Sequence, residues 1–178
     1  ISTGFLPSEA WTYSYDDLDR LTQAAFQGDA TRTKAFTYDA AGNMTSQTVP
    51  GTQLGLGTYQ YPAAASDRPH TPTSIGGQAL TYDDAGNMLT GRGRTITWDG
   101  ENRPTAITMG TGSAARTIGF TYGPDGSRWR KTLPPVAGCP AGTQPPVVDS
   151  FGPEIERKVE VTCVNGTVTT QEIWTKYP

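Results

Sequence analysis

The chain alternates polar and hydrophobic residues in short stretches, and turn-forming residues separate one stretch from the next. In one stretch Phe36 and Tyr38 flank a threonine, and residues 80–82 repeat this arrangement. Successive side chains of a strand point to opposite faces, so Phe36 and Tyr38 are expected on the same face. Asp39 and Gly42 then supply the residue types that a tight turn needs. The pattern predicts a β-hairpin.

The hairpin pattern recurs along the chain with a period of about 22 residues, which fits one hairpin and its connection. A single hairpin is only marginally stable in water, so we expect the copies to stack side by side and share a face. The predicted fold is therefore all-β, an array of antiparallel hairpins forming a curved, twisted sheet. The aromatic residues that anchor the copies are Tyr15, Tyr38, Tyr61, Tyr82, Trp98 and Tyr122.

The turn residues set the register of each copy. The Asp39 carboxylate is expected to accept the backbone N–H two residues on, and Gly42 to adopt a positive φ. Asn102 takes the glycine position in another copy, and asparagine tolerates a positive φ better than most residues. The other turn residues assigned to the repeat are Asp16, Asn43, Asp83, Gly86, Asn87, Asp99 and Gly126.

The same register predicts which side chains meet across a hairpin. Tyr38 is expected to face Met44, and Thr37 to face Thr45, so that one face is aromatic and the other carries hydroxyls. The last copy departs from this rule, because Arg128 stands opposite its anchoring tyrosine. A stacked cation–π pair between Arg128 and that tyrosine is one way to keep the contact across the hairpin.

Composition and charge narrow the class of protein. Only 35% of the residues are hydrophobic and 17% are charged, while 21 glycines and 14 prolines indicate many turns, which excludes a helical bundle or coiled coil. The net charge of −3 and the lack of a basic cluster argue against a nucleic-acid partner. No apolar run approaches the ~20 residues of a membrane-spanning helix. The chain opens with Ile1 and shows no signal peptide, so we expect a piece or a processed product of a longer polypeptide.

The C-terminal part of the sequence has a different character. Prolines interrupt residues 134–146, which are expected to form an irregular insertion. Asn165 and Gly166 follow between two alternating stretches, a strong signal for a two-residue hairpin turn. We therefore divide the chain into a hairpin array, residues 1–133, and a Pro-rich insertion with a hairpin that continues the sheet, residues 134–178.

Cys139 and Cys163 are the two cysteines of the chain. An even number in an extracellular protein favours a disulfide, which would close a loop of about 24 residues and contribute ~3 kcal/mol. The alternative is two separate reduced thiols, with Cys163 packed as a small hydrophobic residue.

Candidate catalytic and metal-binding residues are few. His70 is the single histidine, lies between prolines and has no nucleophile motif near it, so a structural role is expected. Asp39 and Asn43 resemble the start of a calcium loop but supply too few oxygen ligands. Paired carboxylates for glycoside hydrolysis remain open, because a sequence gives no distances. We predict no enzyme activity, no cofactor and no metal.

Aromatic residues outside the anchor positions are candidates for ligand contact, because aromatic rows on a sheet can stack against sugars. A basic and aromatic stretch, residues 128–131, is expected to be a solvated edge and not a nucleic-acid site. The candidates for ligand contact are Trp11, Tyr59, Trp129 and Trp174.

Residues 38–43 combine Tyr-Asp, two further residues and Gly-Asn, and residues 98–103 and 120–126 are looser versions of this motif. Over roughly residues 11–133 the chain resembles the YD-repeat or RHS family. Members of that family include bacterial RHS toxins, the C components of insecticidal toxin complexes and teneurins. The resemblance implies a spiralling β-shell that encloses a cavity, which in the toxins holds a C-terminal toxic domain. The self-cleaving core region that releases this domain has no counterpart in the sequence.

The resemblance implies a non-catalytic wall segment of a secreted or cell-surface shell, with the rest of a large polypeptide and its C-terminal domain as partners. The alternative is an extracellular binding module that contacts carbohydrate or a cell-surface protein through exposed aromatic residues. No nucleic-acid partner and no membrane span are expected.

Overall fold

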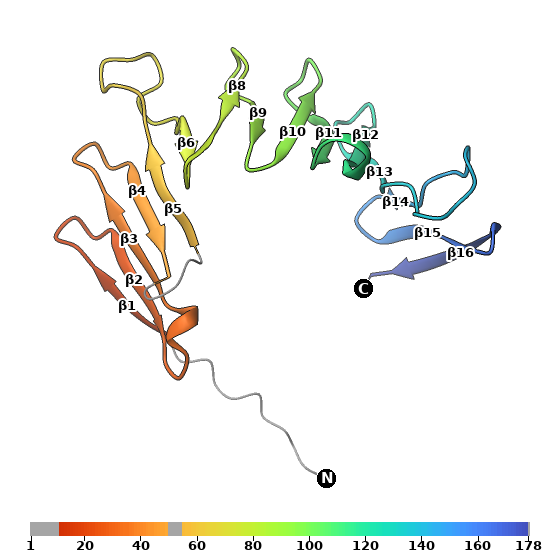
Figure 1. The fold of residues 1–178 in the computed structure, drawn as a ribbon, viewed down its shortest axis with the longest axis horizontal. Helices are drawn as coiled ribbons and strands as arrows, with labels where there is room; N and C mark the ends of the chain where they lie inside the picture. Colours follow the sequence, from red (N-terminus) through yellow and green to blue (C-terminus); the bar gives the residue numbers. More distant parts are fainter. Residues whose placement is uncertain (1–10, 50–54, 178) are drawn as a thin grey trace, which may run out of the picture. The chain divides into compact units, whose positions relative to one another are not determined.

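The computed structural model describes residues 11–49 and 55–177, and the chain divides into two compact units between Leu80 and Thr81. Each unit is built on antiparallel strands, seven in the first unit and nine in the second (Figure 1). Strands that neighbour one another in a sheet also follow one another in the sequence, as expected when hairpins are added in turn. The prediction of an all-β fold of antiparallel hairpins is confirmed.

Residues 11–49 and 55–80 of the first unit form seven strands and one short 3-10 turn. The turn η1 begins after Asp29, whose carboxylate accepts a hydrogen bond from the backbone N–H of Thr31. The elements are β1 (Trp11–Tyr15), β2 (Leu21–Phe26), η1 (Ala30–Arg32), β3 (Lys34–Tyr38), β4 (Met44–Thr48), β5 (Gly55–Gln60), β6 (Ser74–Ile75) and β7 (Gln78–Ala79).

Residues 81–177 of the second unit form nine strands and a second 3-10 turn. The strands are longest at its C-terminal end, where β15 and β16 have ten residues each. The elements are β8 (Thr81–Tyr82), β9 (Met88–Gly91), β10 (Arg94–Trp98), β11 (Pro104–Met109), η2 (Gly112–Ala114), β12 (Arg116–Tyr122), β13 (Arg128–Thr132), β14 (Val147–Phe151), β15 (Ile155–Val164) and β16 (Thr167–Lys176).

Each sheet is a single layer, because the main contacts between elements join strands that follow one another in the chain. Few side chains can be fully buried in such a layer. Among the described residues, the buried hydrophobic side chains are Ala24, Val49, Leu80, Ile96 and Val161. Contacts along the two faces must therefore supply much of the stability that a closed core supplies elsewhere.

The register agrees with the prediction at the anchors and differs one residue further out. Tyr38 pairs with Met44 as expected, but Thr37 pairs with Ser46 and not with Thr45. The reason is a β-bulge beside the turn, which puts one extra residue on the returning strand. The Thr37 hydroxyl still lies 2.7 Å from the hydroxyl oxygens of both Thr45 and Ser46.

The turns have the backbone geometry that their residues favour. Gly42 has a φ of 86°, and Asn102, at the corresponding position of another copy, has a φ of 59°. The Asn165–Gly166 turn joins β15 to β16, and both of its residues also have positive φ. The sequence therefore places these turns correctly.

The C-terminal strands continue the sheet of the second unit. β14 lies between β13 and β15, so the chain returns to the sheet after the Pro-rich residues 134–146. The boundary at residue 133 stays a prediction about sequence organisation, and the compact units divide earlier, after Leu80. No helix within the described ranges is long and apolar enough to cross a bilayer.

Candidate functional sites

The aspartates that begin the turns use their carboxylate oxygens to accept hydrogen bonds within the same turn. Asp83 Oδ1 accepts a hydrogen bond from the backbone N–H of Asn87 at 2.8 Å, and Oδ2 accepts one from Asn87 Nδ2 at 2.9 Å. Asp39 and Asn43 repeat both bonds at 2.8 and 3.0 Å. The Asn87 side-chain hydrogen bond is the main cause that lowers the pKa of Asp83 below the ordinary value of an aspartate. These carboxylates stabilise turns and have little capacity left for a ligand.

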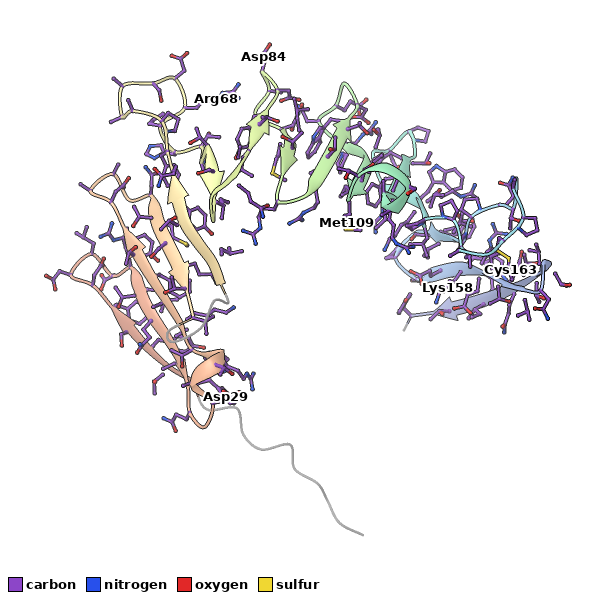
Figure 2. The ribbon with its side chains drawn as sticks, in the orientation of Figure 1. Asp29, Arg68, Asp84, Met109, Lys158 and Cys163 are labelled. Atoms are coloured by element: carbon purple, nitrogen blue, oxygen red, sulfur yellow. A yellow bond between two sulfur atoms is a disulfide. The ribbon has the colours of Figure 1, made fainter. Side chains whose placement is uncertain are left out.

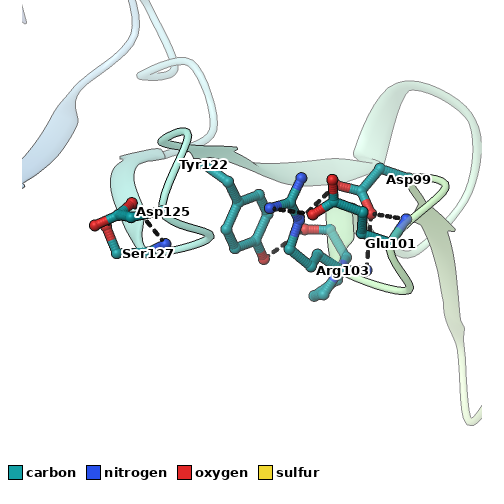
Figure 3. Close-up of polar contacts among 7 residues, drawn as sticks. Asp99, Glu101, Arg103, Tyr122, Asp125 and Ser127 are labelled. Atoms are coloured by element: carbon teal, nitrogen blue, oxygen red, sulfur yellow. Dashed lines mark hydrogen bonds and ion pairs between the residues drawn. The ribbon is translucent and has the colours of Figure 1, made fainter.

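Two other turns replace the asparagine by arginine. Asp99 accepts hydrogen bonds from the backbone N–H of Arg103 at 3.0 Å and from Arg103 Nε at 2.8 Å (Figure 3). Asp16 and Arg20 make the same pair of contacts at 2.9 and 2.8 Å. The arginine thus serves its own turn with Nε and retains a planar guanidinium for a further contact.

Four of the six anchoring aromatic residues connect their hairpin to the one before it by a hydrogen bond. The Tyr38 hydroxyl donates a hydrogen bond to the backbone carbonyl of Leu21 at 2.9 Å. Leu21 is the first residue of strand β2 in the preceding hairpin. We call this arrangement a repeat junction. In it, the anchor side chain of one hairpin donates a hydrogen bond to the backbone carbonyl of the first residue of the second strand of the preceding hairpin. The further junctions are Tyr61 to Met44 at 2.9 Å, Trp98 Nε1 to Met88 at 3.0 Å and Tyr122 to Pro104 at 2.9 Å.

Arginine reinforces two of the repeat junctions. The guanidinium carbon of Arg20 lies 4.8 Å from the centre of the Tyr38 ring, and that of Arg103 lies 4.8 Å from the Tyr122 ring. Figure 3 shows Arg103 between its turn and Tyr122. Each such arginine therefore stabilises its own turn and the next anchor together.

The predicted stacking of Arg128 on Tyr122 is wrong. Arg128 is the cross-strand partner of Tyr122, but its guanidinium lies over the Phe120 ring at 5.4 Å. The physical reason is that Arg103, from the preceding turn, already stacks on Tyr122.

His70 takes part in a contact between a loop and a turn. Its Nδ1 lies 2.6 Å from Asn43 Oδ1, while Asn43 Nδ2 donates to the carbonyl of Pro69 at 3.3 Å. Asn43 thus joins its own turn to the loop that contains His70. Within the described parts of the chain, no group of three or more His, Cys, Asp or Glu residues is placed to hold a metal ion.

A buried ion cluster in the second unit escaped the sequence analysis. Asp149 is 1% exposed and accepts hydrogen bonds from Arg130 at 2.6 and 3.0 Å and from Arg157 at 2.6 and 3.2 Å. The Arg130 hydrogen bond is the main cause that lowers the pKa of the Asp149 carboxyl, and Arg157 adds to it. The three residues lie on β13, β14 and β15, so only the pairing of these strands could have revealed the cluster.

The four candidate ligand-contact residues have different surroundings. In the first unit, Trp11 packs against Phe26 with ring centres 5.1 Å apart, and Tyr59 stacks with Tyr61 at 6.5 Å. In the second unit, the half-buried Trp129 lies under the guanidinium of Arg130 at 4.5 Å.

Trp174 is the most open of the four candidates. It is 58% exposed and stacks with Phe151, which is 50% exposed, at 5.9 Å between ring centres. Arg157 lies 5.9 Å from the Trp174 ring centre, so Trp129 and Trp174 are connected through the ion cluster of Asp149.

A disulfide joins Cys139 in the Pro-rich stretch to Cys163 on β15, with 5.2 Å between their Cα atoms (Figure 2). It attaches the irregular segment to the sheet. Cys163 is half-buried and lies beside the turn of the last hairpin, two residues after the buried Val161.

No family model matches the chain, and no curated protein matches it. Solved structures that resemble it include a chain of the Photorhabdus luminescens Tc holotoxin pore, determined with a mutant TccC3. The match has a TM-score of 0.51 and 16% sequence identity, and it covers 96% of this chain. It covers 11% of the toxin chain, so this chain spans only a small part of the length of the protein that it matches. At this identity the likeness concerns the fold.

Proposed function

We propose that this chain is a non-catalytic wall segment of a larger secreted or cell-surface YD-repeat polypeptide, whose β-shell encloses or presents a partner domain. The repeat junctions carry this proposal. Four anchors donate hydrogen bonds to the preceding repeat, and the carboxylates of Asp39 and Asp83 accept hydrogen bonds within their own turns. Such a distribution suits a wall, in which each unit contacts its neighbours.

The fold likeness to a chain of a toxin complex supports the same role, because that chain is much longer and contains this fold as a part. The absence of enzyme activity remains part of the proposal. It is supported by the turn aspartates, whose oxygens are occupied, and by His70, whose ring contacts an asparagine side chain.

The wall role can be tested on the full-length parent polypeptide, purified and run on native and then on denaturing gels. We expect a C-terminal fragment that is cleaved from the chain yet remains bound until denaturation. A parent that runs as one intact chain and retains no fragment would contradict the wall role.

The pair of Phe151 and Trp174 favours a second candidate function, recognition of carbohydrate or of a cell-surface protein. Both rings are at least half exposed and stack on each other. Binding to a panel of glycans should then be lost in Trp174→Ala and kept in Trp11→Ala, a matched change at a tryptophan that packs against Phe26. Equal binding by both variants, or none by the wild type, would remove this candidate.

A further inference from the structure

The aromatic face of the second unit becomes basic after the last repeat. Arg128 occupies the position opposite an anchor at which other hairpins carry Leu21, Met44, Met88 or Pro104. The next cross-strand row on this face places Lys131 beside Val148, and Val148 beside Lys158. The β-bulge at Trp129 offsets the alternation of β13, so Arg128 and Lys131 both lie on the face of their partners Tyr122 and Phe120. Three cationic side chains thus follow the aromatic row on the same face of the sheet.

A shallow pocket of about 310 Å³ opens among these side chains. β13, β14 and β15 contribute two residues each, which are Arg128 and Lys131, Val148 and Ser150, and Glu156 and Lys158. All six lie on one face of three neighbouring strands, by alternation on β14 and β15 and through the bulge on β13. The pocket therefore has a floor fixed by the sheet, with a valine and a serine at its centre.

The charges of the pocket are unequal. Glu156 is the one acidic residue among its six lining residues, against three cations. Lys158 Nζ is paired with Glu160 Oε1 at 2.6 Å, and the Arg128 guanidinium lies against the Phe120 ring. Lys131 makes no ion pair with any other described residue, although it is half-buried. A positive, incompletely paired pocket on a chain of net charge −3 indicates an anionic partner.

The spacing of the cations indicates what kind of anion fits. Lys131 and Lys158 lie on strands separated by β14, so their backbones are about 10 Å apart. Alternate residues of an extended peptide place side chains on one side at intervals of about 7 Å. Two flexible lysines can meet carboxylates at that spacing, while Val148 offers an apolar floor between them. A single phosphate would use only part of this pocket and would lie close to Glu156.

We propose that this pocket binds an extended acidic segment of a partner polypeptide, with carboxylates at alternate positions pairing with Lys131 and Lys158 and with Arg128 close by (Figure 2 labels Lys158). The inference goes beyond the wall role and stands on the geometry of three strands alone. It gives this face of the sheet a partner of defined chemistry.

The test is a fluorescence anisotropy titration of the full chain with a labelled peptide of alternating Glu and Thr. We expect saturable binding that weakens as salt rises, because the contacts are solvent-accessible ion pairs. The double variant Lys131→Gln/Lys158→Gln should bind about tenfold more weakly. The matched control Lys34→Gln/Lys176→Gln removes the same charge away from the pocket and should bind as the wild type does. The variant Lys131→Arg should bind the peptide with the affinity of the wild type, because it keeps the positive charge.

Circular dichroism establishes that each variant is folded before it is titrated. Equal binding by the pocket double variant and the wild type would overturn the proposal. Equal binding of a peptide with Gln in place of Glu would also overturn it, since charge would then play no part. Inorganic phosphate that displaces the peptide at concentrations near the peptide's own Kd would identify a simple oxyanion site and reject the acidic segment.

Discussion

Polar groups of single side chains connect neighbouring strands and hairpins of this protein laterally within the sheet. The Tyr38 hydroxyl bonds to a carbonyl of the previous hairpin, and the Asp149 carboxylate receives arginines from the strands on both sides. In a single-layer sheet such lateral contacts carry much of the stability, so their loss should be measurable residue by residue.

Tyr38→Phe removes one hydrogen bond of a repeat junction and leaves the ring and its contact with Arg20. We expect the free energy of unfolding of the first unit to fall by about 1 kcal/mol. Urea titration followed by circular dichroism measures this change. Tyr13→Phe is the matched control, because Tyr13 is 55% exposed, and it should leave the stability unchanged. If the two changes lowered the unfolding free energy equally, the hydrogen bond of the repeat junction would not contribute to stability.

Asp149 should make the stability of the second unit depend on pH. Its folded pKa lies below that of an unfolded aspartate, about 3.9, so its contribution is complete above pH ~5 and is lost as the pH falls through the folded pKa. Urea titrations of the wild type and of Asp149→Asn from pH 7 to pH 2 measure this dependence. At neutral pH the variant should be less stable by about 3 kcal/mol, at the low end for a broken buried pair because Arg130 and Arg157 are partly exposed. The difference should shrink in acid, and a constant difference would contradict the assignment.

At the scale of the strand and turn, the hairpins follow from local chemistry that the sequence displays. The alternation of Phe36 and Tyr38, together with Asp39 and Gly42, predicts both strands and the turn, and Tyr38 meets Met44 as expected. Strand β14 was not predicted, because Val147–Phe151 follows a Pro-rich stretch and is a strand only through pairing with β13 and β15. The Asp149 cluster depends on the same pairing and was missed for that reason.

Gly42→Ala tests the turn directly. Gly42 has a φ of 86°, which alanine adopts only with strain, although nothing stands within 4 Å of an added Cβ. We expect a loss of about 1 kcal/mol in the unfolding free energy, measured by urea titration. Gly100→Ala is the control, because Gly100 has equally open surroundings and no positive φ. A neutral or stabilising effect at Gly42 would show that the turn can change its conformation.

At the scale of the whole molecule, two units are present, and the second is tied to its irregular segment by the disulfide of Cys139 and Cys163. The exposed edge strand β16 and the aromatic pair on β14 and β16 also belong to this unit. The likeness to a chain of a toxin complex concerns the fold and leaves the partner to experiment.

Replacing both cysteines by serine opens a loop that spans 24 positions in the sequence. The free energy of unfolding of the second unit should fall by about 3 kcal/mol, because the unfolded chain gains freedom. Differential scanning calorimetry of the variant and the oxidised wild type measures the loss. The first unit contains no cysteine, so its transition serves as the internal reference and should not move.

The repeat junctions use a main-chain carbonyl as the acceptor, and every type of amino acid supplies one. Leu21, Met44, Met88 and Pro104 fill this position in turn, yet the bond to the next anchor keeps the same length within 0.1 Å. As far as this hydrogen bond is concerned, a hairpin can therefore be duplicated, deleted or exchanged without a matching change in the side chains of its neighbour, although Arg20 and Arg103 add a side-chain contact at two junctions. An architecture with such interchangeable parts can lengthen or shorten by recombination within its own gene while its sequence drifts.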